Sequence, residues 1–307
     1  MQSIAWLVIR PFSSRGNPAI IPRILWIPIK CFIVPNSKKL TDGYEVNIAK
    51  FSGLVSVHNR RSSKEIADEW SRKIFGKKFS DNQYTSRIPA VIARHVYVLE
   101  TIIKNIKLKN KKLCDFGAGE GQFLEFLKKK NLGCKLFGIE PSEKNCKILS
   151  KKKINNFRGT VEDFSKKKNI AKFDIVTLMW TLCNTSNSYE IIKKASELLN
   201  NNGYIVVAES SRILVPFKKP IQMYFGKGNP DIHPFHFSKN SLSNLLIINK
   251  FKPIFINRYI DSDYLLVIAK KIDKIETKKI NLDDYKKVKK FFEVWFKESK
   301  KYNKEII

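Results

Sequence analysis

Short apolar runs alternate with amphipathic segments through the middle of this chain of 307 residues. Residues 112–116 and 173–179 have the length and the β-branched or aromatic content of buried strands. The segment 189–199 repeats apolar residues at the spacing of an amphipathic helix. The alternation predicts an α/β fold with a mostly parallel sheet and helices on both faces. Further strands are predicted at 134–139, 156–158 and 204–208, and further helices begin at Glu120, Ser142 and Ser238.

Two helical patterns precede the first strand. One spans residues 62–74 and opens on Ser62-Ser63-Lys64-Glu65, which resembles a capping box. The other spans residues 91–106, and its pattern predicts one buried face, made of Ile92, Val96, Leu99 and Ile103. We therefore expect a helical cap over residues 46–106.

The C-terminal part closes the predicted sheet. Residues 253–258 and 264–269 predict a terminal antiparallel hairpin. Residues 210–238 are too long and too rich in Pro and Gly for a plain connection, so we interpret them as a substrate insert within a domain of residues 107–270. Residues 271–307 are rich in lysine and predict a C-terminal amphipathic helix.

A glycine-rich turn follows the first strand of this domain. Residues 113–121 read LCDFGAGEG, in which an apolar run ends on Asp115 and breaks into alternating glycines before a helix. Glycine tolerates positive φ and lets the backbone approach a ligand closely. The stretch predicts a cofactor cradle.

Composition adds charge to this picture. The chain carries 58 Lys and Arg against 28 Asp and Glu, a net charge of +30, which favours anionic partners. The excess is mostly lysine spread along the chain, so a general compositional bias explains it better than a dedicated nucleic-acid surface. The five cysteines form no CxxC pair, and we predict no disulfide, no metal site and a cytoplasmic location.

The N-terminal extension, residues 1–45, is basic and apolar. Residues 1–41 contain no acidic residue, and their uncharged runs are too short to cross a bilayer, so no transmembrane segment is predicted. A targeting sequence, a peripheral membrane contact and an extension without function all fit this composition.

Five motifs in order resemble class I S-adenosylmethionine-dependent methyltransferases. The first is the glycine-rich stretch at 113–121, and the others are FGIEPS at 137–142, GTVEDF at 159–164, FDIV at 173–176 and NGYIVV at 202–207. The resemblance covers residues 111–270 and implies a Rossmann-like fold, S-adenosylmethionine as cofactor and methyl transfer as the activity.

The resemblance also implies the cofactor site. Glu140 would accept hydrogen bonds from both ribose hydroxyls, and Glu162 or Asp163 would meet the adenine amino group. The implied cofactor-binding residues are Asp115, Gly117, Ala118, Gly119, Glu140, Pro141, Val161, Glu162, Asp163 and Trp180. A nicotinamide-binding domain is the competing interpretation, and Gln122 argues against it because it breaks the G-x-G-x-x-G fingerprint.

The insert carries the clue to the acceptor. Residues 231–238, DIHPFHFS, resemble a segment of small-molecule and sugar methyltransferases in which the first histidine serves as a base. His233 and His236 are therefore the candidate catalytic residues, since a histidine with a pKa near neutrality suits proton removal from a hydroxyl or from a carbon beside a carbonyl. The alternative is that both histidines merely orient the helix at Ser238.

We predict a methyltransferase for a small-molecule acceptor, of an anionic, sugar or sugar-nucleotide type. A nucleic-acid methyltransferase is the first alternative, although residues 179–184, MWTLCN, lack the Asn-Pro-Pro-aromatic motif of base-amine enzymes and Cys183 lacks the proline that precedes a nucleophilic cysteine. A noncatalytic protein with a cofactor fold is the second. The sequence leaves the oligomeric state and the methylated atom open.

Overall fold

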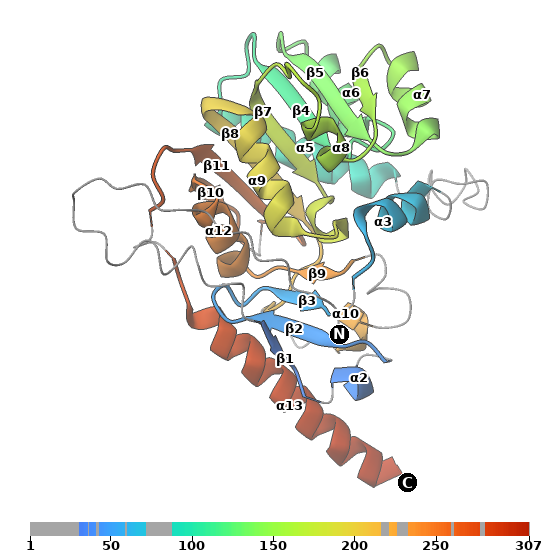
Figure 1. Cartoon of the computed structure of the whole chain (residues 1–307), viewed down its shortest axis with the longest axis vertical. Helices are drawn as coiled ribbons and strands as arrows, with labels where there is room; N and C mark the ends of the chain where they lie inside the picture. Colours follow the sequence, from blue (N-terminus) through green and yellow to red (C-terminus); the bar gives the residue numbers. More distant parts are fainter. Residues whose placement is uncertain are drawn as a thin grey trace.

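The chain folds around two β-sheets, which Figure 1 shows at opposite ends of the molecule. We describe a computed structural model over residues 31–35, 37–40, 43–58, 60–71, 88–215, 221–225, 233–258, 261–276 and 280–306. Within these residues one sheet has seven strands and the other has four.

The seven-stranded sheet forms the larger part. Its strands are β4 (Lys112–Phe116), β5 (Lys135–Glu140), β6 (Asn155–Arg158), β7 (Phe173–Met179), β8 (Leu199–Glu209), β10 (Phe251–Ile256) and β11 (Leu265–Lys271). In the order β10-β11-β8-β7-β4-β5-β6, the strands from β8 to β6 are parallel, while β11 and β10 are antiparallel to their neighbours. The predicted parallel sheet and terminal hairpin are confirmed. The order in which the strands are added to the sheet reverses at β4: β5 and β6 follow on one side of it, and β7 and β8 on the other. Open α/β sheets bind ligands at the carboxyl ends of the strands beside such a switch point.

Helices cover both faces of this sheet. Helices α5 (Ile88–Asn105), α6 (Gln122–Lys129) and α7 (Glu143–Lys151) cover one face, and α8 (Val161–Ser165), α9 (Ser188–Leu198) and α12 (Lys239–Ile248) cover the other. Successive strand residues enter opposite cores: Val206 packs with the first group of helices and Val207 with the second. The predicted helices on both faces are therefore confirmed.

The buried face of α5 differs from the prediction. Ile92, Val96 and Ile103 are 39%, 37% and 44% exposed. Of the predicted face only Leu99 is buried, and the helix buries His95, Val98 and Ile102 beside it. Both stripes have helical periodicity, and packing against α6 selects the second.

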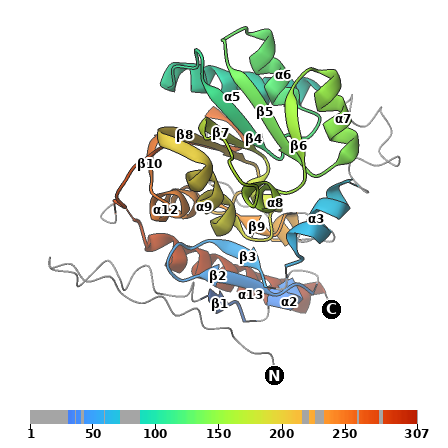
Figure 2. The ribbon, with the colours of Figure 1, turned by 45° about the horizontal axis from the view of Figure 1, so that its top comes forward.

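The four-stranded sheet joins segments that are distant in the sequence. It runs in the order β1 (Cys31–Ile33), β2 (Val46–Ala49), β3 (Val55–Val57) and β9 (Phe235–His236), all antiparallel. The short helices α2 (Ser37–Leu40) and α10 (Gln222–Phe225) and the C-terminal helix α13 (Asp283–Ile306) complete this part of the molecule. Figure 2 shows α13 lying along the outer side of β1–β3. This small core contains Val46, Ile48, Val55, Val57, Ile213, Tyr224, Phe225, Val288 and Phe292.

Two predicted segments contain strands that the sequence did not predict. Residues 31–34 of the predicted extension belong to the small sheet, where Val34 is buried. The predicted helical cap over 46–106 begins with β2 and β3, and its second helix, α5, packs on the larger sheet. The prediction of an all-helical cap was wrong because runs of three or four residues are too short to show the period of a strand.

The helix α3 (Ser63–Glu69) is the remaining part of the predicted cap. Ser62 and Glu65 form the predicted capping box. Ile74, where the predicted helix ends, lies outside the described residues, as do residues 1–30. No helix within the described ranges combines the length and the apolar character that a membrane span requires.

Truncation of Phe292 tests whether α13 is integral to the fold. This ring is 1% exposed and packs against Phe225, with 5.9 Å between the ring centroids. We expect Phe292→Ala to lower the free energy of unfolding by about 3–5 kcal/mol, because it leaves a cavity in the small core. Urea unfolding measures the change. Val294→Ala, at a position 44% exposed on the same helix, is the control and should change stability by less than about 0.5 kcal/mol. Equal effects of the two variants would show that α13 is not packed as described.

Candidate functional site

The loop between β4 and α6 lies at the carboxyl end of the larger sheet. Gly117, Gly119 and Gly121 have φ angles of 72°, 55° and 74°, in the left-handed region that favours glycine. The N–H groups of Gly117 and Ala118 both donate to the carbonyl of Ile139, at 2.8 and 3.0 Å. These bonds hold the loop against the end of β5.

Open space lies beside only one of these three glycines. A Cβ added to Gly117 would lie 2.6 Å from the Thr181 side chain, and one added to Gly121 would lie 2.4 Å from that of Leu149. A Cβ added to Gly119 would meet no described atom within 4 Å. The first and third glycines therefore allow close packing of the protein itself, whereas Gly119 borders room for a ligand.

Asp115 lies beneath the loop in β4. Its carboxylate is 2% exposed and accepts a hydrogen bond of 2.6 Å from the Thr177 hydroxyl on β7. Burial raises the pKa of Asp115 to about 7, the bond from Thr177 opposes this, and the nearby Glu140 carboxylate adds to it. Asp115 therefore ties β4 to β7 at the switch point.

Glu140 ends β5 beside the same loop. One carboxylate oxygen accepts the Gly119 N–H at 2.8 Å, and the other accepts the Ser142 N–H at 2.9 Å and the Asn145 amide at 3.3 Å. Burial raises its pKa, against the lowering effect of these bonds. The structure thus brings Asp115, the glycine loop and Glu140 together, as the sequence predicts. Pro141 follows Glu140 and is partly exposed.

The third predicted motif lies in α8. Val161 is 7% exposed, and Glu162 accepts a hydrogen bond of 2.6 Å from the Ser63 hydroxyl at the start of α3. Asp163 is exposed and caps its own helix by accepting a bond of 2.9 Å from Thr160. Helix α3 therefore meets the predicted adenine side of the site through Glu162, and Asp163 has a local structural role.

Trp180 follows β7 directly and has a φ of 57°. Its ring centroid lies 5.1 Å from that of His95 and 5.5 Å from that of Tyr264. Its buried indole N–H makes no hydrogen bond to any described residue. The ring therefore packs under the site, between α5 and the segment that leads into β11.

His233 lies across from the turn after β7. This turn is the short helix η2 (Leu182–Asn184), and the Nδ1 of His233 lies within hydrogen-bonding distance of the Asn184 Oδ1 and 3.5 Å from the Cys183 sulfur. Burial lowers the pKa of His233 to about 4, so the imidazole is neutral at pH 7. Cys183 is fully buried and burial raises its pKa, which confirms a core thiol.

The structure separates the two candidate histidines. His236 is 4% exposed and pairs with Val55 in the small sheet. Its ring lies 4.5 Å from that of Phe225 and 5.8 Å from that of Tyr224. His236 therefore packs with rings of the small core, whereas His233 contacts η2, and a catalytic role for either histidine stays a prediction.

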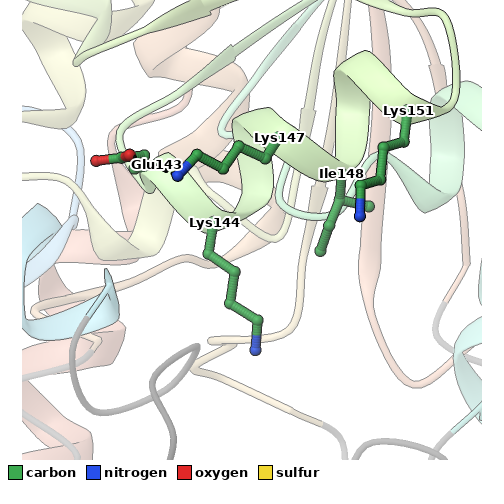
Figure 3. A pocket seen from close by; sticks show the side chains of 5 residues that line it. All are labelled: Glu143, Lys144, Lys147, Ile148 and Lys151. Carbon is green, nitrogen blue, oxygen red and sulfur yellow. Dashed lines mark ion pairs between the residues drawn. The ribbon is translucent and has the colours of Figure 1, made fainter.

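A lysine-rich pocket lies away from the residues described so far, on the solvent side of α7. Figure 3 shows Lys144, Lys147 and Lys151 along it, together with Glu143 and Ile148. Glu143 pairs with Lys147 at 2.8 Å and with Arg158 at 2.9 Å. We interpret this pocket as a solvated helix face. No group of three or more metal-ligating side chains occurs among the described residues.

Comparison with known families assigns the fold. Residues 84–248, more than half of the chain, match the family model described as a methyltransferase domain. The chain belongs to the class I S-adenosylmethionine-dependent methyltransferases. The matched range includes α5, β4–β8 and α12, and therefore all the site residues described above.

Individual relatives of this methyltransferase agree with that assignment. It is 32% identical, over 131 residues, to the ubiquinone biosynthesis O-methyltransferase of Pelagibacter ubique. The match covers 38% of this chain and 52% of that protein, so the chain spans about half the length of this curated relative.

Two solved structures share the fold. A SAM-dependent methyltransferase from Thermotoga maritima has a TM-score of 0.50 at 17% identity, covering 67% of this chain and all of that one. The 1,6-didemethyltoxoflavin-N1-methyltransferase of Burkholderia thailandensis, solved with its acceptor and S-adenosylhomocysteine, has a TM-score of 0.50 at 13% identity, covering 75% of this chain and 96% of that one.

The residues at the switch point fit the cofactor of this family. The open space beside Gly119 admits a ligand against the backbone, and the adjacent buried carboxylates of Asp115 and Glu140 suit an ammonium group and hydroxyl groups respectively. S-adenosylmethionine carries both kinds of group.

Substitution of Asp115 by Asn tests the electrostatics of the site. A carboxyl whose pKa rises from 3.8 to about 7 on folding binds its proton more tightly in the folded state. Stability is therefore lost as the pH rises from about 4 to about 7, and the loss is complete above this window. Asp115→Asn removes the ionisation, so we expect it to raise the free energy of unfolding of the ligand-free protein by about 1–4 kcal/mol at pH 8 and to give no gain at pH 4.

Urea unfolding at the two pH values measures this effect, and Asp174→Asn is the control on β7. Although burial raises the pKa of Asp174, its bonds from Lys112 and Asn200 outweigh burial and lower it. The control should therefore lose stability at pH 8. A stability difference between Asp115→Asn and wild type that does not change with pH would contradict the raised pKa.

Three residues of the site escaped the sequence analysis: Thr177, Asn184 and Glu209. Asn184 lies 49 residues from His233, and nothing local in the sequence pairs the two. Glu209, the last residue of β8, did carry a signal, because it is an acidic residue directly after the predicted apolar run 204–208, where parallel sheets place ligand-binding groups.

Proposed function

We propose that this methyltransferase transfers a methyl group to a hydroxyl oxygen of a small-molecule acceptor, with His233 as the base. The observation that carries the proposal is the contact between His233 Nδ1 and Asn184 Oδ1 at the carboxyl end of β7. In this fold, acceptors are expected at the same edge of the sheet as the cofactor loop.

The contact supports a proton on Nδ1 of His233. The Asn184 amide nitrogen donates to the Trp180 carbonyl at 2.9 Å, so its oxygen faces His233. An amide oxygen only accepts hydrogen bonds, and Nδ1 must therefore be the donor. Nε2 then holds a lone pair, and no described residue donates to it. This is the tautomer that a base requires.

The low pKa of His233 favours an acidic hydroxyl. Burial keeps the imidazole neutral at pH 7, so it can accept a proton. Its low pKa makes it a weak base. A phenol, with a pKa of about 10, releases its proton to such a base more readily than an aliphatic alcohol does. We therefore favour a phenolic acceptor over the sugar or sugar-nucleotide type that the insert suggests by its sequence.

The relative from Pelagibacter supports transfer to oxygen, since it is described as an O-methyltransferase. Bound S-adenosylmethionine supplies an electrophilic methyl group. The protein contributes position: the loop at Gly117–Gly119 and Glu140 orient the cofactor, His233 removes the acceptor proton, and α3 lies over Glu162 to limit water.

The test is formation of S-adenosylhomocysteine by the full chain with panels of acceptors. We expect turnover with phenols, less with sugars and sugar nucleotides, and none with amines of matched size. Calorimetry with S-adenosylmethionine first establishes that the sample binds cofactor. Turnover with amines alone would overturn the assignment to oxygen. Turnover with RNA alone, lost steeply with added salt, would support the nucleic-acid alternative.

A further inference from the structure

Glu209 occupies an unusual place at the end of β8. It is the last residue of this strand, 0% exposed, in register with Leu265 of β11. Burial raises its pKa to about 7, against the lowering effect of hydrogen bonds from Cys183 and Leu182, and no cation among the described residues contributes. A buried carboxyl without a cationic partner is unfavourable unless hydrogen bonds satisfy it, which points to a specific role.

The partners of Glu209 are the backbone groups that open η2. One carboxylate oxygen accepts the Leu182 N–H at 2.6 Å and the Cys183 N–H at 3.2 Å. The first N–H groups of a helical turn have no partner within the turn. Leu182 and Cys183 are both fully buried, so water does not replace the carboxylate there. Glu209 thus holds the start of the turn in place.

The far end of the same turn carries Asn184. Its position depends on η2, which is closed by the bonds from the Asn184 N–H to the Thr181 carbonyl at 2.9 Å and from the Thr185 N–H to the Leu182 carbonyl at 3.4 Å. The Asn184 oxygen in turn meets Nδ1 of His233. A continuous route of hydrogen bonds and one short turn therefore runs from the end of β8 to the proposed base.

We propose that Glu209 is a positioning residue for His233, which acts by holding the Leu182–Asn184 turn so that Asn184 keeps the proton of the imidazole on Nδ1. The inference rests on the proposed function of His233 as a base, but its immediate consequence, the tautomer, is measurable without any acceptor.

The experiment measures the tautomer of His233 by ¹⁵N chemical shifts in the full chain labelled at histidine. The chain has four histidines, and the spectrum of His233→Ala assigns the signal. Wild type should show the Nδ1–H form. Glu209→Ala should show a mixture with the Nε2–H form, together with a kcat lowered by about 10–100-fold and an unchanged affinity for S-adenosylmethionine. Glu209→Gln keeps an acceptor oxygen and should restore the Nδ1–H form.

Glu209→Leu guards against a misfolded alanine variant, since it fills the same space and offers no acceptor. Calorimetry with S-adenosylmethionine verifies that each variant is folded. An Nδ1–H tautomer retained in both Glu209→Ala and Glu209→Leu overturns the proposal, even if His233→Ala abolishes turnover. If the tautomer of His233 shifts in the Glu209 variants but His233→Ala keeps its turnover, Glu209 does position His233, and His233 is not the base of the proposed function.

Discussion

Gly119→Val is expected to abolish measurable binding of S-adenosylmethionine while leaving a folded protein. An added Cβ at this position meets no described atom within 4 Å, so the isopropyl group extends into the space where we propose that the cofactor binds. Its φ of 55° adds strain for a β-branched residue. Overpacking of about 3 kcal/mol corresponds to a loss of affinity of about 100-fold or more.

Calorimetry measures the affinity, and the thermal shift induced by the cofactor gives a second readout. Gly133→Ala is the matched control. Gly133 has a φ of 70° and lies near Asn110, at the opposite end of the strands. The control bears the same kind of backbone strain and should bind the cofactor normally. If Gly119→Val retains wild-type affinity, the cofactor does not bind against this loop.

His233→Ala is expected to lower kcat by about 10²–10⁴-fold, the range that a positioned base contributes. The affinity for S-adenosylmethionine should not change, because the proposed cofactor contacts lie on β4 and the loop after it, on β5, on α8 and at Trp180, and His233 is not among them. Steady-state kinetics with a phenolic acceptor, once one is identified, measures the loss. The effect should appear in kcat more than in KM, since a base acts on the reacting proton.

His58→Ala is the control for this substitution. His58 follows β3 in the small sheet, its side chain is 40% exposed, and it contacts Asn47 rather than η2. It should retain wild-type turnover. Equal kcat and KM values for His233→Ala and wild type would show that His233 is a structural residue. Catalysis would then depend on the positioning of the cofactor alone.

Local sequence patterns determined the larger sheet and which residues meet at its proposed cofactor site. β4 and β7 were predicted with their observed ends, because buried parallel strands are continuous apolar runs that stand out from their neighbours. Asp115, Gly119 and Glu140 follow directly from this, since residues at the carboxyl ends of adjacent parallel strands meet at one edge. The order of the motifs along the chain sufficed to identify the family.

The small sheet required the tertiary structure. Its strands have two to four residues, too few to establish a period of two, and they come from both the N-terminal segment and the insert. The burial of His236 in the small core follows from this sheet, and so does its separation from His233. For α5, two apolar stripes competed, and contact with α6 decided which one is buried.

The sequence by itself therefore determined the fold family and the cofactor, and it predicts where the cofactor binds, because all three depend on short, local motifs. Only the tertiary structure assembled Glu209, Asn184 and His233, which come from the end of β8, the turn after β7 and the segment before β9. Their relation depends on contacts between residues 27 and 49 positions apart, and such contacts leave no periodic trace in the chain. The proposed acceptor chemistry depends on that arrangement.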